Sequence, residues 1–432
     1  MKTQLKKGDK KLLNAWAFYD WANSVYSLTI VSAVFPLFIG AYLETKNITK
    51  LNAFGFELTH TALITYLTAF GFLIVAFISP ILSGIADYVG NKKSFLRFFC
   101  YMGSFACMGL YFFRIDYIHV SLLCYLIALV GFWASLVFYN SYLPDVAYKE
   151  QQDAVSAKGF SLGYVGSVIL LIINLALILS TPDKNKLFMM RISFVMVGLW
   201  WFGFSHYTYA YLPAIKSRHK VTKEIVFSGF KELKKVWREL TNQLRLKRYL
   251  AAFFIYSMAV QTVMLVAAYF GEQEIKWEES GIDKTMGLII SILLIQLIAV
   301  LGAFLTSKSS SKYGNIKTLI GINIIWIGIC IYAYFVIDAI QFFIAAGVVG
   351  LIMGGIQSLS RSTYSKFLPE TEDTTSYFSF YDVAEKIGIV IGMGIFASVE
   401  VITGSMRSSI LFLILFFVIG LILLFRVPKE IE

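Results

Sequence analysis

Twelve apolar stretches of close to 20 residues or more constrain this chain most strongly. About 20 consecutive apolar residues are needed for an α-helix to cross the hydrocarbon core of a bilayer. Six stretches precede a polar interval and cover residues 14–43, 61–86, 95–113, 120–143, 159–180 and 187–213. Six follow it and cover residues 249–270, 285–306, 317–337, 340–360, 376–402 and 408–425. The pattern predicts an all-α membrane protein with twelve transmembrane helices.

Composition excludes the soluble alternatives. The 432 residues are 58% hydrophobic and only 15% charged, whereas a soluble domain carries about 25% charged residues. That charge is too little to cover the surfaces of two or three soluble domains, and the chain is too apolar to be disordered. The four cysteines lie in apolar stretches without the spacing of a disulfide framework or a metal site. No metal and no cofactor are expected.

The net charge of +11 becomes informative once the basic residues are sorted by loop. With the N-terminus on the cytoplasmic side, the loops on that side hold 28 of the 38 Lys and Arg residues and the opposite loops hold 8. Basic residues concentrate in cytoplasmic loops of membrane proteins, so both termini are predicted to be cytoplasmic. The same bias accounts for the high pI, and a nucleic-acid partner is not expected.

The polar interval between the two sets has a pattern of its own. Apolar residues recur there at alternating steps of four and three, with lysines and arginines between them. They are Val226, Phe230, Leu233, Trp237, Leu240 and Leu244. We expect an amphipathic basic helix within residues 222–247 that lies on lipid headgroups or against the bundle. Recruitment of a partner protein is the alternative interpretation.

The two sets of helices are related by an internal duplication. Three short matches follow one another at offsets of 224, 225 and 218 residues. They pair Gly90–Lys93 with Gly314–Lys317, Leu143–Asp145 with Leu368–Glu370, and Phe160–Ser161 with Phe378–Ser379. We therefore expect pseudo-symmetric six-helix bundles over residues 1–213 and 249–432, joined by a cytoplasmic linker over 214–248. Duplicated halves around a midplane site are typical of secondary transporters, whereas channels more often use oligomeric symmetry.

The segment between the second and third stretches, Ser83–Lys93, resembles the signature of the major facilitator superfamily. Asp87, Gly90, Lys92 and Lys93 fit that signature, while Ser83, Tyr88 and Asn91 depart from it. The resemblance implies a cytoplasmic gate, to which Asp145 and Arg361 are added as candidates. Gly90 would permit the tight turn, and Asp87 could accept hydrogen bonds from a neighbouring helix N-terminus. An ordinary polar turn is the alternative.

Three longer strings resemble one branch of that superfamily, the autophagy-related vacuolar amino-acid effluxers. They are Tyr19–Ser24, Gly354–Ser362 and Phe380–Lys386. The resemblance covers nearly the whole chain and implies an exporter of amino acids or similar small solutes.

Polar and ionisable residues inside the predicted spans are the candidates for substrate binding or proton coupling, because such groups are costly in a bilayer and usually face the bundle interior. They are Asp20, Asn23, Arg191, Gln357, Asp382, Glu385 and Lys386. Asp382 and Lys386 are four residues apart and could neutralise each other. Glu385 would then remain as the unpaired carboxylate, suited to proton exchange.

Each candidate also has a purely structural interpretation. Asp20 and Asp382 lie toward the cytoplasmic ends of their helices and could act as a latch or cap. The Asp382–Lys386 pair could be a simple bridge, and Arg191 could extend to the membrane interface. Gln357 could bond between helices.

Together these features predict a secondary transporter, and not an enzyme, that moves a small organic solute by rocker-switch alternating access. Amino-acid export is implied by the resemblance, with Glu385 or Asp20 exchanging a proton. A drug or sugar permease and a non-transporting receptor or scaffold are the alternatives. We expect a monomer in a bacterial cytoplasmic membrane, a eukaryotic organelle being the other possibility.

Overall fold

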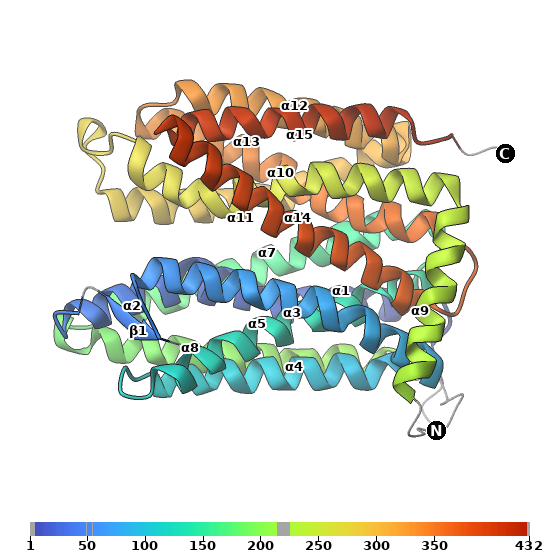
Figure 1. Ribbon diagram of the computed structural model, residues 1–432, viewed down its shortest axis with the longest axis horizontal. Coiled ribbons are helices and arrows are strands. Elements are labelled where there is room, and N and C mark those ends of the chain that lie inside the picture. The colour runs from blue at the N-terminus through green and yellow to red at the C-terminus, as the bar shows by residue number, and fades with distance from the viewer. Residues whose placement is uncertain (1–4, 49, 54, 214–224, 430–432) are drawn as a thin grey trace.

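The computed structural model describes residues 5–48, 50–53, 55–213 and 225–429. Within these residues, twelve helical segments are long and apolar enough to cross a membrane, which confirms the predicted number. They lie side by side in two stacked groups, and the described residues nearest both termini lie at the same end of the bundle (Figure 1). We call this the terminal end.

The first group contains six spans and a small β-hairpin. The first span joins α1 (Lys10–Val25), the π-helical η1 (Tyr26–Val34) and α2 (Phe35–Glu44). The hairpin follows, with β1 (Leu51–Ala53) antiparallel to β2 (Phe56–Leu58). The remaining elements are α3 (His60–Val89), α4 (Lys92–Gly109), η2 (Leu110–Phe112), α5 (Ile118–Asn140), α6 (Leu143–Val146), α7 (Lys149–Leu179) and α8 (Asp183–Tyr211).

The second group follows the surface helix α9 (Ile225–Asn242). Its elements are α10 (Leu244–Glu274), η3 (Glu278–Ser280), α11 (Lys284–Tyr313), α12 (Asn315–Phe335), α13 (Ala339–Phe367), α14 (Thr374–Thr403) and α15 (Met406–Phe425). The first half of the molecule comprises α1 to α8, and the second half comprises α10 to α15.

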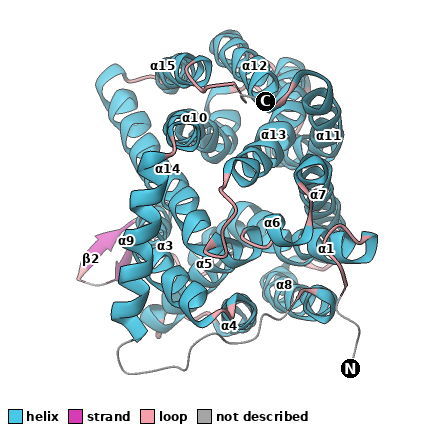
Figure 2. Cartoon of the chain, turned by 90° about the vertical axis from the view of Figure 1, so that its right-hand side faces the viewer, coloured by secondary structure: helices cyan, strands magenta, loops and turns pink. Residues whose placement is uncertain are grey.

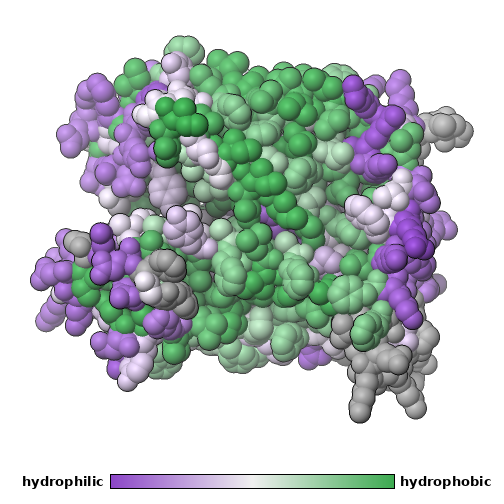
Figure 3. Space-filling view, in the orientation of Figure 1, coloured by the Kyte–Doolittle hydropathy of each residue, from purple (hydrophilic) through white to green (hydrophobic). Residues whose placement is uncertain are grey.

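Each half has its own apolar core. One cluster of buried side chains comes from residues 12–212, and the other, apart from Tyr164, from residues 236–427. The outer surface carries a broad apolar band with hydrophilic residues at both ends (Figure 3). That distribution is expected for a bundle whose sides face lipid. At the end opposite the termini, the outline is indented between the two halves (Figure 3).

The helix ends at the terminal end use the turn residues that the sequence offers there. Gly90 terminates α3 in the left-handed region with φ 75°, which glycine adopts without a steric penalty. Asn91 then caps α4, its side chain accepting from the amide of Ser94. In the second half Gly314 occupies the matching turn with φ 84°.

Three details differ from the sequence-based expectations. The hairpin over residues 51–58 was not predicted, because its strands of three residues are too short to show an alternating pattern. The linker helix ends at Asn242 and α10 already begins at Leu244, so the linker predicted over 214–248 extends too far. Residues 222–224 of the predicted helix, and the rest of 214–224, lie outside the described residues.

Helix α9 runs across the terminal end, roughly perpendicular to the spans (Figures 1 and 2). It contacts α3 of the first half together with α10 and α14 of the second half. Of the predicted stripe, Leu240 is buried, whereas Phe230 and Trp237 remain about half exposed.

Candidate functional site

Arg361 of α13 is the centre of a buried polar cluster that joins the two halves. Its side chain is 4% exposed, and Nη2 lies 3.1 Å from Oδ2 of Asp20 on α1. Nε donates to Ser156 Oγ at 3.0 Å, and Nη2 also donates to the Ser156 carbonyl at 3.0 Å. Nη1 donates to Asn140 Oδ1 at 3.2 Å. A buried arginine is stable only when its donors are satisfied, and here three helices of the first half provide the acceptors.

Aromatic rings enclose the same guanidinium group. Its central carbon lies 4.8 Å from the ring centroid of Trp16 and 4.2 Å from that of Phe160. These distances allow cation–π attraction, which is strongest away from water. Tyr139 contributes a hydroxyl that donates to Asp20 Oδ2 at 2.9 Å. Asp20 therefore has two donors, one from each half of the molecule.

Lys386 of α14 forms a second buried cluster. Its side chain is fully buried, and Nζ lies 3.1 Å from Asp382 Oδ1 and 2.6 Å from Glu385 Oε2. Nζ also lies 3.7 Å from the ring centroid of Trp133 on α5 of the first half. One ammonium thus faces two carboxylates, so the cluster of ionised groups carries an excess negative charge.

The expectation that Glu385 would remain unpaired was wrong. Glu385 contacts Lys386 and also accepts from Gln261 Nε2 at 2.8 Å. Adjacent residues on a helix point about 100° apart, but the long glutamate side chain bends back to the ammonium. Oδ2 of Asp382 is instead the oxygen that is buried without a hydrogen-bond partner among the described residues. Glu385 keeps 18% of its side chain exposed, against 7% for Asp382.

Three of the predicted site residues lie outside these two clusters. Gln357 accepts from the Tyr164 hydroxyl at 2.7 Å, which links α13 to α7. Asn23 is buried, accepts from its neighbour Ser24, and leaves Nδ2 without a partner among the described residues. Arg191 lies toward the opposite end, where it donates to the Tyr111 carbonyl at 2.6 Å and stacks on Phe38.

Two of the predicted gate residues, Asp87 and Lys92, join the halves at the terminal end, where α3 and the start of α4 meet α14. Arg361, also predicted for the gate, is instead the centre of the first buried cluster. Asp87 accepts from the backbone amides of Thr375 and Ser376, at 3.3 and 2.6 Å. These amides belong to the first turn of α14, where a carboxylate interacts favourably with the helix dipole and the free N–H groups. Asp87 therefore ties the end of one half to the start of a helix in the other.

The neighbouring lysines of the signature have different partners. Lys92 forms an ion pair with Asp145 and donates to Thr374 Oγ1 of the second half at 2.9 Å. Lys93 donates to the Leu212 carbonyl at 2.8 Å and so stays within the first half. Lys92, but not Lys93, takes part in joining the halves.

We expect Asp87→Ala to lower the free energy of unfolding by about 0.5–2 kcal/mol, the usual cost of losing an N-terminal cap. Thermal unfolding of the purified protein measures this. Asp87→Asn keeps one acceptor oxygen and should lose less. An Asp87→Ala protein as stable as the wild type would contradict the inferred latch.

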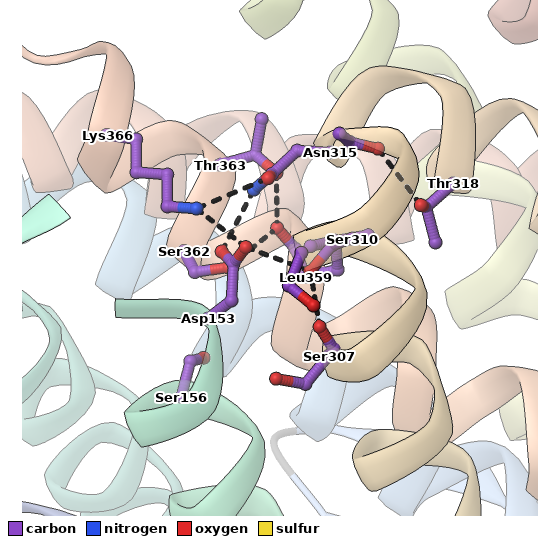
Figure 4. Close-up of polar contacts among 12 residues, drawn as sticks. Asp153, Ser156, Ser307, Ser310, Asn315, Thr318, Leu359, Ser362, Thr363 and Lys366 are labelled. Atoms are coloured by element: carbon purple, nitrogen blue, oxygen red, sulfur yellow. Dashed lines mark hydrogen bonds and ion pairs between the residues drawn. The ribbon is translucent and has the colours of Figure 1, made fainter. Parts of the chain in front are cut away.

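A second connection at the terminal end was missed by the sequence analysis (Figure 4). Asp153 of α7 accepts from Ser310 Oγ at 2.9 Å and from Asn315 Nδ2 at 2.9 Å. Lys366 of α13 lies 2.6 Å from the same carboxylate. Asp153 thus holds the first half to the turn between α11 and α12, which corresponds in the duplication to the turn after Asp87.

Helix α9 adds a third connection. Lys235 lies 2.8 Å from Asp373, the residue before α14, and 2.9 Å from Glu232. Hydrogen bonds to Asp373 and Glu232 raise the pKa of Lys235, while burial raises the pKa of the Glu232 carboxyl. On its other side α9 packs closely on α3, where Gly229 lies against Gly84.

We expect Gly229→Leu to release α9 from the bundle. A Cβ at this position would lie 2.8 Å from Ile85 Cγ1 and 3.0 Å from the Ile85 amide nitrogen, which is too close for packed atoms. Trypsin should then cut at Lys231 and Lys234 at least about tenfold faster, because cleavage requires local opening. Gly203→Leu is the matched control, since a Cβ at that position meets nothing within 4 Å. Equal cleavage of both variants would contradict the packing argument.

The other residues that sequence reasoning missed are Tyr139, Ser156 and Trp133. All three are of types that a membrane helix carries routinely as packing or interfacial residues. Their roles come from partners that lie far away in the sequence, 205 positions in the case of Ser156 and Arg361. Within the described residues, no group of three or more His, Cys, Asp or Glu side chains could hold a metal ion.

Comparison with known proteins identifies the family. A family model described as "Vacuole effluxer Atg22 like" matches residues 8–431. The chain belongs to this family. It is 32% identical over 424 residues to the uncharacterized MFS-type transporter YxiO of Bacillus subtilis, covering 96% of this chain and 95% of YxiO. It is 23% identical over 456 residues to autophagy-related protein 22 of Eremothecium gossypii, covering 93% and 88% of the two chains.

Solved structures place this Atg22-like chain in the major facilitator fold. The Escherichia coli fucose:proton symporter FucP matches with a TM-score of 0.70 at 16% identity, covering 97% of this chain and 98% of FucP. The proton:xylose symporter XylE matches with 0.71 at 11% identity, covering 97% and 95%. Together with the family match, the identity to the MFS-type transporter YxiO and the twelve candidate spans, this makes the protein an integral multi-pass membrane protein of the major facilitator superfamily, and its family and fold are those of transporters.

Proposed function

We propose that this transporter exports amino acids or closely similar zwitterions, coupled to protons, by alternating access. The observation that carries this proposal is the Lys386 cluster, which offers one buried ammonium and two carboxylates beside the boundary between the halves. A zwitterionic solute needs partners of both signs when it leaves water. The family description as an effluxer supports the outward direction.

The proposed orientation places both termini in the cytoplasm. The 28-to-8 distribution of basic residues between the two sets of loops supports it. In that orientation the connections made by Asp87, Asp153 and Arg361 close the cytoplasmic end, and the indentation in Figure 3 faces outward. The connections must break and re-form as the first half and the second half rock against each other.

Proton exchange is assigned to Glu385. It retains more contact with solvent than Asp382 does, and its loss of charge would leave Lys386 balanced by the remaining carboxylate. Protonation therefore converts a cluster with excess negative charge into a neutral one. Asp20, by contrast, is bound by both Arg361 and Tyr139, and its proposed role is to connect the two halves through Arg361.

The substrate class is tested by counterflow in proteoliposomes. Vesicles are loaded with an unlabelled solute at high concentration, and entry of the same labelled solute is measured against protein-free vesicles. Amino acids should exchange, and sugars should not. Exchange of sugars or cationic drugs alone would overturn the substrate assignment, and a failure to exchange any solute would favour a receptor or scaffold. We propose a monomer in a bacterial cytoplasmic membrane as the active form.

A further inference from the structure

A polar pocket of about 310 Å³ lies at the terminal end, apart from the two buried clusters. It is formed where α7 of the first half meets α10, α12 and α13 of the second. Of the described residues, three basic ones line it, Lys149, Arg245 and Lys366, together with one acidic residue, Glu150. A pocket of this size can hold a small ligand.

The basic groups come from different elements and converge on one space. Lys149 is the first residue of α7 and Arg245 the second of α10, so each lies on the bundle's rim. The Arg245 guanidinium stacks on Phe367 with its central carbon 4.0 Å from the ring centroid. Lys366 also lines the pocket, and its ammonium pairs with Asp153 at 2.6 Å. Stacking fixes the plane of a guanidinium group and preorganises its donors.

The backbone adds to the positive character of the pocket. The pocket includes the start of α12, Gly314 to Ile316. No side chain among the described residues caps the start of α10 or of α12, so the amides of their first turns have no such partner there. The dipoles of these helices also favour an anion at that end.

We propose that this pocket binds a phosphate-bearing anion. Arginine and lysine side chains together with helix amides form the donor set that recognises phosphate groups. Because Lys149 belongs to the first half and Arg245 to the second, the bound anion bridges the halves. Its binding therefore favours the state in which the terminal end is closed, since a ligand shifts an equilibrium toward the state that it binds better. This last consequence rests on the proposed alternating access, whereas binding itself does not.

The phosphate group can come from a lipid headgroup or from a soluble phosphate. Thermal unfolding of the delipidated protein is measured in inorganic phosphate and, separately, in dioctanoyl phosphatidylglycerol, with sodium chloride at the same ionic strength as reference. A saturable rise in the unfolding temperature is expected. A response to inorganic phosphate identifies a soluble ligand, and a response to the lipid alone identifies a headgroup.

Variants locate the binding. Lys149→Gln combined with Arg245→Gln should weaken binding at least about tenfold, while Lys149→Arg should retain it. Lys184→Gln removes one charge from an exposed residue at the opposite end of the molecule and should leave binding unchanged. Failure of both probes to give a saturable rise would overturn the proposal. An undiminished rise in the unfolding temperature of the double variant would also overturn the proposal. Lys149→Arg keeps the positive charge and shows whether a folded variant with that charge still binds.

The bridging consequence has its own measurement. Spin labels at Phe98→Cys on α4 and Phe425→Cys on α15 report the distance between the halves, because both positions are exposed. Saturating probe should increase the population with the shorter distance. An unchanged distribution despite demonstrated binding would overturn the bridging role and leave the proposed transport function untouched.

Discussion

Arg361→Gln is expected to abolish transport and to lower the free energy of unfolding by about 3–5 kcal/mol, the usual cost of leaving one partner of a buried ion pair uncompensated. Among the described residues, Asp20 would keep only the Tyr139 hydroxyl as a donor. The stacking of the guanidinium on Trp16 and Phe160 would also be lost. Chemical or thermal unfolding and counterflow in proteoliposomes measure the two effects.

The matched control removes a cation from an exposed ion pair. Lys276 lies 2.8 Å from Glu279, and both side chains are more than half exposed, so Lys276→Gln should cost less than about 1 kcal/mol. Asp20→Asn added to Arg361→Gln should recover part of the stability, because no charge is then left uncompensated. Transport should not recover. An Arg361→Gln protein with wild-type stability would contradict the inference that the buried cluster around Arg361 holds the two halves together.

Glu385→Gln is expected to abolish the response of transport to a pH gradient while solute exchange continues. An amide cannot exchange a proton in this range, yet it can still bond to Gln261, and Lys386 keeps Asp382 as its counter-charge. One proton per solute and a gradient of one pH unit can sustain about a tenfold solute gradient, since one unit corresponds to about 1.4 kcal/mol. The variant should lose that accumulation and retain counterflow.

Asp382→Asn distinguishes the two carboxylates of the cluster. It leaves Glu385, the more exposed one, as the partner of Lys386, so the response to the pH gradient should persist. The reverse outcome, with the response lost in Asp382→Asn and kept in Glu385→Gln, would show that the proton site has been assigned to the wrong residue.

The spans were predictable because the length of an apolar run is a local property that the bilayer thickness fixes. The turn at Gly90 was predictable for a similar reason, since the signature is contiguous. The contact partners of the site residues were not predictable from the sequence. Asp20 and Arg361 were both named from the sequence, but for different roles, and nothing local pairs residues 341 positions apart.

Asp153 shows what a fuller use of the duplication could have found. It stands in the first turns of α7, where a polar residue is common. However, Asp373, which precedes α14, is 220 positions later and falls within the range of offsets of the other matches. Residues of one type near the start of corresponding helices in the two halves are candidates for similar connections. The actual contacts differ, since Asp153 binds Lys366 and Asp373 binds Lys235.

The central claim is that Glu385 couples solute movement to protons, and one measurement tests it most directly. Proteoliposomes that contain wild-type protein or Glu385→Gln are equilibrated with labelled amino acid, and a pH gradient of one unit is then imposed. We predict that wild-type vesicles accumulate or expel the solute by up to about tenfold, and that Glu385→Gln vesicles stay at equilibrium. The same response in both proteins, or no response of the wild-type protein to the gradient, would contradict proton coupling through Glu385.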